Sequence, residues 1–270
     1  MNQYKNVNEL WAAVVNGDTK PAVSDFFVTG ASYIYQTTQF PDSSTKYHNY
    51  YLLLRVRAYF GACSHVPEQL GVDAAGELSG KALKSCLTDP RLPVRIAAMD
   101  AYFGTVYPHE RQCSEAVELP GGTPTEKAEF RDNLIADIAK VEQGMKIALI
   151  GVVNPLVAAI RKRGGTCLPC DLQMERTQWG DPVEKDMEKV LDSADGVICT
   201  GMTLSNGTFD RVIERVLERS IPLTVYAQTG SAVAARFVGA GITSLVAEPF
   251  PFSQFSANAT RVFCYRGQGD

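Results

Sequence analysis

The second half of the chain, from Lys146 onward, repeats one pattern: a short apolar run, a polar turn and an amphipathic segment. Continuous apolar runs are typical of strands in a parallel sheet that is covered on both faces, and the segments between them have the three- and four-residue spacing of helices. We therefore predict an α/β, Rossmann-like domain with a mainly parallel sheet and helices on both faces. The strands are predicted at 146–153, 167–172, 197–199, 223–226, 244–247 and 261–265, and the helices at 155–162 and 183–193, after Asn206, and at 232–238.

The first half has a mixed pattern, typical of an α+β domain. Apolar residues at helical spacing predict helices at 7–15, 76–87 and 93–107, and β-branched or aromatic runs predict strands at 22–29, 32–39 and 50–56. We interpret the first two strands as a hairpin that turns at Gly30. A polar, glycine-containing segment at 108–124 precedes an amphipathic helix at 125–141. The predicted domains are therefore 1–124 and 125–270.

Composition and charge narrow the classes of partner. The chain has 270 residues, 45% of them hydrophobic and 21% charged, which is ordinary for a globular protein. A net charge of −4 gives no electrostatic reason to expect nucleic acid or an anionic membrane as a partner. No apolar stretch reaches the roughly 18 residues of a membrane span, and the N-terminus shows no signal peptide, so we expect a cytoplasmic protein. A homodimer stays open, because the sequence does not define an oligomeric state.

The polar turn between the predicted strand at 197–199 and the next helix is the strongest candidate for a ligand site. Open α/β sheets bind ligands at the carboxyl ends of their strands, and this turn supplies hydroxyl and amide groups there. The candidate pocket residues are Thr200, Gly201, Thr203, Asn206 and Thr208. The alternative is a turn without chemistry, in which Asn206 only caps the following helix.

Two further strand ends add candidate ligand-binding residues. Gly151 and Asn154 follow the first strand, and Asp171 lies about 20 residues beyond Gly151, where a dinucleotide-binding domain has its ribose-binding carboxylate. Only one glycine stands where the dinucleotide fingerprint needs three, so standard NAD binding is disfavoured. The loop after the fourth strand could bind an anion through outward-facing backbone N–H groups at the start of the next helix. The alternative is a capped turn in which Ser231 is the N-cap. That loop consists of Gln228, Thr229, Gly230 and Ser231.

Cysteine and carboxylate positions give weaker signals. The chain has seven cysteines, too few and too scattered for a disulfide framework, and Cys167 and Cys170 share a redox or zinc spacing without a second pair. We expect these two to pack in the core. Asp100 lies within an apolar helical stretch, and a buried carboxylate of this kind is either a structural anchor or a site residue.

The segment 200–208, together with the sequence VYAQTGSAVAARFVGAGITSLVAEPF after it, resembles a prokaryotic family described as putative heavy-metal chelation. The buried helical segment 96–102 and the region 30–38 are similar to the family as well. The resemblance implies an enolase-type N-terminal α+β domain joined to a Rossmann-like domain, with a site in the cleft between them. The chain departs from the family in having Asp100 where Asn is frequent, and Gln228–Ser231 where a proline-containing loop is frequent.

Two functions remain open. The protein binds or processes a metal ion or a small metal-chelating metabolite in the interdomain cleft, or it is a metal-independent enzyme acting there on an amino-acid-derived or nucleotide metabolite. For the first function, a divalent metal would meet Asp100 and Asp171, helped by the side chains of Asn206, Thr200 and Thr203. Any remaining coordination would come from the small ligand, because the second domain lacks the Cys or His spacings of an all-protein metal site.

Overall fold

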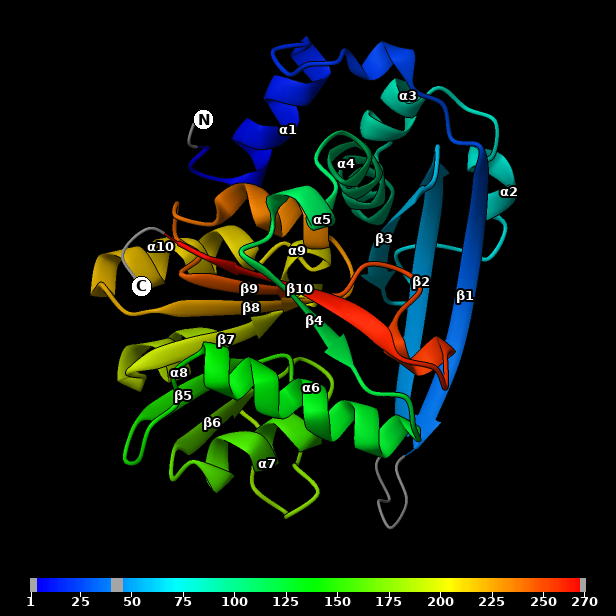
Figure 1. Ribbon diagram of the computed structural model, residues 1–270. Helices are drawn as coiled ribbons and strands as arrows, with labels where there is room; N and C mark the ends of the chain where they lie inside the picture. Colours follow the sequence, from blue (N-terminus) through cyan, green and yellow to red (C-terminus); the bar gives the residue numbers. More distant parts are fainter. Residues whose placement is uncertain (1–3, 40–45, 268–270) are drawn as a thin grey trace.

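The computed structural model describes residues 4–39 and 46–267 and contains two sheets that stand side by side (Figure 1). The first is antiparallel, with strand order β1–β2–β3. Its strands are β1 (Gly30–Gln39), β2 (Lys46–Val56) and β3 (Tyr59–His65). The helices of this half are α1 (Val7–Asn16), the 3-10 helix η1 (Val23–Asp25), α2 (Ala74–Leu78), α3 (Leu83–Leu87), α4 (Leu92–Val106) and α5 (His109–Gln112).

The predicted hairpin around Gly30 is wrong. Residues 22–29 form η1 and an irregular segment, because this stretch hydrogen-bonds to residues 80–83: Val28 N donates to the Lys81 carbonyl, and Leu83 N to the Phe26 carbonyl. β1 pairs instead with β2, whose C-terminal part matches the predicted strand at 50–56. The sequence pattern also fails to reveal β3, and it predicts one helix at 76–87, where Gly80, with φ of 83°, separates α2 from α3.

The second sheet has seven strands in the order β4–β10–β9–β8–β7–β5–β6. The neighbouring strands β6, β5, β7, β8 and β9 run parallel, while β10 and β4 are antiparallel to their neighbours. The predicted mainly parallel α/β sheet is therefore confirmed. The strands are β4 (Glu115–Leu119), β5 (Lys146–Ile150), β6 (Thr166–Cys170), β7 (Gly196–Thr200), β8 (Leu223–Ala227), β9 (Ser244–Ala247) and β10 (Thr260–Arg266). The helices are α6 (Pro124–Ile138), α7 (Asn154–Lys162), α8 (Met187–Ser193), α9 (Met202–Ser205), α10 (Phe209–Arg219), α11 (Ser231–Ala234) and the 3-10 helices η2 (Ala235–Phe237) and η3 (Ser253–Phe255).

The order of the parallel strands creates a switch point beside β5. The chain leaves β5 toward β6 on one side and then crosses to β7 on the other, so the loops after β5 and β7 diverge. In open α/β sheets, ligands bind in the crevice at the carboxyl ends of two such strands. The polar turns after residues 150 and 200 therefore lie where this architecture places a ligand.

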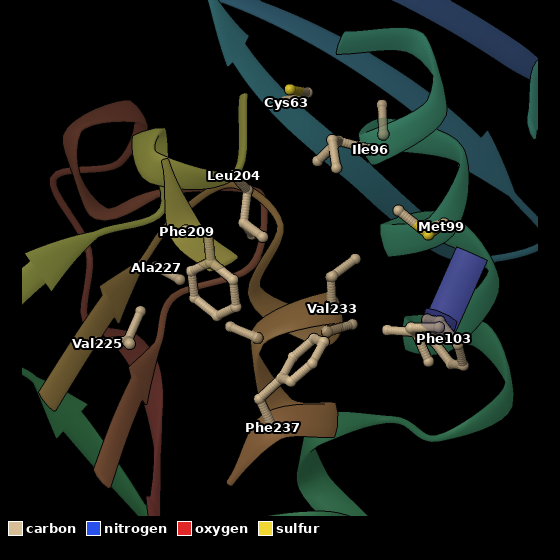
Figure 2. Packing of buried hydrophobic residues seen from close by; sticks show 14 of the residues in the cluster. Cys63, Ile96, Met99, Phe103, Leu204, Phe209, Val225, Ala227, Val233 and Phe237 are labelled. Atoms are coloured by element: carbon tan, nitrogen blue, oxygen red, sulfur yellow. The ribbon is translucent and has the colours of Figure 1, made fainter. Parts of the chain in front are cut away.

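Helix α4 packs between the two halves of the molecule. It packs on β2 and β3 on one side and on α9 and α11 on the other, which explains why nearly all of its side chains are buried. Figure 2 shows Met99 and Phe103 of α4 facing Val233 and Phe237 across this core. One continuous apolar cluster thus includes residues of both halves, while α6 and α7 cover the opposite face of the large sheet (Figure 1).

The predicted boundary after residue 124 stays a prediction. Strand β4 precedes this boundary and pairs with β10 at the edge of the large sheet. The resemblance of the first half to an enolase N-terminal domain likewise stays a prediction. Within residues 4–39 and 46–267, none of the helices combines the length and apolar character of a membrane span.

Candidate functional site

A cavity of about 360 Å³ opens at the switch point, between the large sheet and the end of β3. Residues of both halves of the chain form its walls. The first half contributes His65, Val66 and Gln69. The second half contributes residues from the segments 150–151, 170–173, 185–188 and 200–208.

His65 ends β3 and is 4% exposed, and its ring packs against the rings of Tyr33 and Tyr50. Its Nδ1 lies 2.9 Å from the Val66 carbonyl, so the proton is placed on Nδ1 and the lone pair on Nε2. Nε2 is buried and has no hydrogen-bond partner among the described residues. Burial lowers the pKa of His65, so the ring is neutral at pH 7 and Nε2 is free to accept a proton or a metal ion.

Thr200 supplies a second buried polar atom of this kind. It ends β7 and lines the same cavity, and its Oγ1 has no hydrogen-bond partner in the described residues. Gly151, at the end of β5, lies directly against it: a Cβ at Gly151 would be 2.3 Å from Thr200 Oγ1. Gly151 also has a φ of 87°, so a side chain there would both strain the backbone and fill the crevice. Unpaired buried polar atoms are costly, and their presence on a cavity wall points to a ligand.

The cavity brings together half of the residues predicted from the sequence to bind a ligand. Asp171 accepts hydrogen bonds from Val152 N at 2.9 Å, Gln173 N at 2.8 Å and Met174 N at 3.0 Å, which holds the loops after β5 and β6 together. These contacts give Asp171 a framework role in addition to its place on the wall. The predicted residues that line this cavity are Gly151, Asp171, Thr200, Thr203, Asn206 and Thr208.

The turn after β7 differs in detail from the prediction. Residues 202–205 form α9, Thr203 Oγ1 donates to the Thr200 carbonyl, and Asn206 ends α9 instead of capping the next helix. Thr208 is the N-cap of α10, and Asn206 Oδ1 accepts from Thr208 N at 3.0 Å. Gly201 has a φ of −57°, so its backbone conformation does not require glycine. The close approach that does require one is to the Thr229 carbonyl oxygen, which would lie 2.2 Å from a Cβ at this position, and not to the cavity.

At the loop after β8, two backbone N–H groups already have partners in the first half of the chain. Gly230 N donates to the Ala62 carbonyl, and Ala232 N donates to Asp100 Oδ1, so the first half of the chain occupies these donors. Thr229 and Ser231 are buried, and Ser231 Oγ lies 3.1 Å from His109 Nε2. Gln228 lines a different cavity.

Asn154 and Asp100 also hold the framework together. Asn154 begins α7, donates from Nδ2 to the Tyr47 hydroxyl at 2.8 Å and accepts from Gln178 N at 3.1 Å. Asp100 accepts from Ala62 N at 2.8 Å and Ala232 N at 2.7 Å, and burial raises its pKa to about 7. These contacts identify Asp100 as an anchor between the sheets. Among the described residues, no three His, Cys, Asp or Glu side chains form a metal-binding group.

The site predicted from the sequence includes no sulfur-containing residue and no histidine. In the structure, Cys170, Met187 and Met202 line the cavity together with His65. Cys167 and Cys170 are free thiols on opposite faces of β6, since residues an odd number of positions apart point to opposite sides of a strand. Burial raises the pKa of Cys167 to about 12 and that of Cys170 to about 11, opposite to the shift of a redox-active thiol.

A family model described as DUF364, putative heavy-metal chelation, matches residues 133–243. The resemblance to this family is confirmed. A DUF364 protein of unknown function from Desulfitobacterium hafniense DCB-2 aligns with a TM-score of 0.63 and 15% identity, covering 96% of this chain and 97% of that one. A second DUF364 protein, from Pyrococcus horikoshii, gives a TM-score of 0.52 and 14% identity over 88% of this chain and 86% of that one. At these identities the two structures show a shared fold. No curated protein matches the chain significantly.

Proposed function

We propose that the protein binds a transition-metal ion, carried by a small organic chelator, in the cavity at the switch point. The observation that carries this proposal is His65, which lines a cavity walled by residues of both halves and whose buried Nε2 has no partner in the described residues. Its Nδ1 is held by the Val66 carbonyl, which is the usual second contact of a metal-binding imidazole. The family description, heavy-metal chelation, agrees with this chemistry.

The donor atoms favour a transition metal over magnesium or calcium. The imidazole of His65 and the thioether side chain of Met202 line the cavity, and nitrogen and sulfur ligands of this kind prefer nickel, cobalt, copper or zinc. This preference differs from the oxygen-rich donor set expected from the sequence. Asp171, the one predicted metal ligand on the wall, already accepts three backbone hydrogen bonds.

The size of the cavity favours a chelate over a bare ion. About 360 Å³ far exceeds the space of a single ion and falls in the range of small-molecule sites. The exposed apolar side chains of Leu172 and Met202 stand at its wall and would contact the organic part of the ligand. Thr200 Oγ1 would then hydrogen-bond to the chelator.

Titration with Co(II)–nitrilotriacetate tests this function, because the chelator leaves coordination positions open and the visible spectrum of Co(II) reports new ligands. We expect wild-type protein to bind and to change the spectrum. His65→Gln should weaken binding at least about tenfold, which is about 1.4 kcal/mol. His48→Gln is the matched control, since His48 is exposed on β2 outside this cavity. Equal binding by wild type and His65→Gln, with both folded, would contradict the proposal.

The same imidazole favours a second function, metal-independent catalysis on an amino-acid-derived or nucleotide metabolite. A neutral histidine whose Nδ1–H is fixed and whose Nε2 is free has the arrangement of a general base. A thermal-shift screen of such metabolites in the presence of EDTA separates the two functions. Stabilisation by a metabolite in EDTA favours the enzyme, and stabilisation only by metal-containing complexes favours the chelate.

A further inference from the structure

A second cavity, of about 130 Å³, lies at the other face of the large sheet, between α6, β2 and the end of β8. Tyr226, on its wall, belongs to the apolar cluster under α6, whereas Ile150, on the wall of the first cavity, belongs to the cluster on the opposite face. The small sheet separates the cavities in the same way. Tyr51 lines the second cavity, and His65 pairs with Tyr50, whose side chain points to the other face of β2.

Arg131 of α6 is the central group of this second cavity. It is 8% exposed, and its guanidinium lies 4.9 Å from the ring centre of Tyr226. Nε donates to Asp132 Oδ1 at 2.8 Å, which fixes the orientation of the guanidinium. Within the described residues, Nη1 and Nη2 donate no hydrogen bond, and Glu248 Oε2 lies 4.0 Å from Nη1. The guanidinium of Arg131 therefore has a fixed orientation in a buried position, and its two terminal nitrogens have no acceptor among the described residues.

The charges around the cavity are arranged asymmetrically. Lys127 and Arg131 line it, whereas Asp132 and Glu248 lie behind them and do not. Glu248 Oε2 already accepts from the Tyr226 hydroxyl at 2.6 Å and from Gln228 Nε2 at 3.1 Å. Lys127 Nζ already donates to the Ser256 and Asn258 carbonyls at 2.9 and 2.6 Å, so Arg131 is the cation on this wall with donors left for an anion.

We propose that this cavity binds a small carboxylate through the paired terminal nitrogens of Arg131. The planar fork of arginine matches a carboxylate with two parallel hydrogen bonds. The cavity's volume of about 130 Å³ equals that of roughly four waters, which is room for a short carboxylic acid. The neutral side chains of Tyr47, Asn49 and Tyr51 line the rest of the wall and would contact its remaining part.

The structure favours a carboxylate over a phosphate. Phosphate sites commonly use free N–H groups at a helix N-terminus, and α6 begins at this cavity with Pro124. The first turn of α6 is closed by a capping box in which Glu126 accepts from Thr123 N at 2.8 Å. A carboxylate of the protein thus already occupies this helix end, leaving Arg131 as the anion donor.

Calorimetric titration of the full chain with succinate, with neutral succinamide as the matched ligand, tests the proposal. We expect succinate to bind and succinamide not to bind. Arg131→Lys keeps the charge beside Asp132 and Glu248 but loses the fork, and should weaken succinate binding at least about tenfold. Asn49→Leu should weaken it as well, because it fills the cavity and leaves the charged groups in place.

Arg163→Lys is the control, since Arg163 bonds to Asp137 and Asn133 outside this cavity, and it should bind succinate like wild type. His65→Gln should also bind succinate normally, which separates this proposal from the metal–chelate function. The proposal is overturned if wild type binds no succinate, if phosphate binds more tightly than succinate, or if both cavity variants, shown to be folded by thermal unfolding, bind succinate unchanged.

Discussion

Asp100 and His65 are both buried polar residues, but only Asp100 has hydrogen bonds for both of its polar atoms inside the protein. Its two oxygens accept from the backbone of β3 and α11, whereas His65 Nε2 has no partner in the described chain. The sequence leaves Asp100 an equal candidate for anchor and ligand, and it gives His65 no place in the predicted site. A lone histidine carries little signal, because its unpaired atom and its cavity exist only in the folded chain.

The burial of Asp100 leads to a prediction about how stability depends on pH. Its carboxyl titrates near 3.8 when unfolded and near 7 when folded, because burial disfavours its charge. Between these values the folded protein binds more protons than the unfolded chain, so this residue's contribution to stability falls as pH rises. Asp100→Asn cannot titrate. In urea unfolding at about pH 5 and about pH 8, wild type should lose stability relative to Asp100→Asn at the higher pH. A pH-independent difference between the two would contradict this account.

At the scale of elements, the sequence predicts a strand or helix best where every residue of the segment has the same surroundings. The apolar runs at β5, β7 and β8 are buried on both faces and pack within the large sheet, so their pattern alone predicts them. Residues 22–29 also contain β-branched and aromatic residues, but they make an irregular contact with residues 80–83 that no local pattern reveals, and only Val23, Phe26 and Val28 are buried. Residues 202–205 read as a turn in the sequence and form the short helix α9.

Strand β6 carries a prediction about the cysteine pair. Cys167 and Cys170 face opposite sides of the strand, and burial raises the pKa of both thiols, so we predict that the pair is neither a redox couple nor a shared zinc site. Replacing both with serine should change the free energy of unfolding by about 1–2 kcal/mol, as modest core changes do. Urea unfolding and elemental analysis check this. Zinc that is bound in proportion to wild-type protein and lost from the double variant would show the prediction to be wrong.

At the scale of the whole molecule, the two halves share one apolar cluster through α4. We therefore predict a single cooperative unfolding transition, although the sequence predicts two domains. The chain has two tryptophans, Trp11 in the first half and Trp179 in the second. Single-tryptophan variants, Trp179→Phe and Trp11→Phe, should report the same urea midpoint as circular dichroism of the same variant. Separate midpoints for the two reporters would mean that the halves unfold independently.

The candidate site also depends on the whole molecule. The general rule for α/β sheets predicts the residues after β5 and β7, and six of the predicted ligand-binding residues line the cavity. The same rule predicts the loop at 228–231, but the first half covers that loop and uses its donors. How the two halves meet is a property of tertiary packing, and it decides which strand ends remain open.

The most direct measurement of the central claim is a crystal structure of the protein with Co(II)–nitrilotriacetate, with anomalous diffraction recorded at the cobalt edge. The account predicts one strong anomalous peak in the cavity beside Thr200, within coordination distance of His65 Nε2, at roughly 2.0–2.2 Å as for nitrogen ligands of similar metals. An ordered complex with the metal at exposed His48, or anywhere else away from His65, would contradict it.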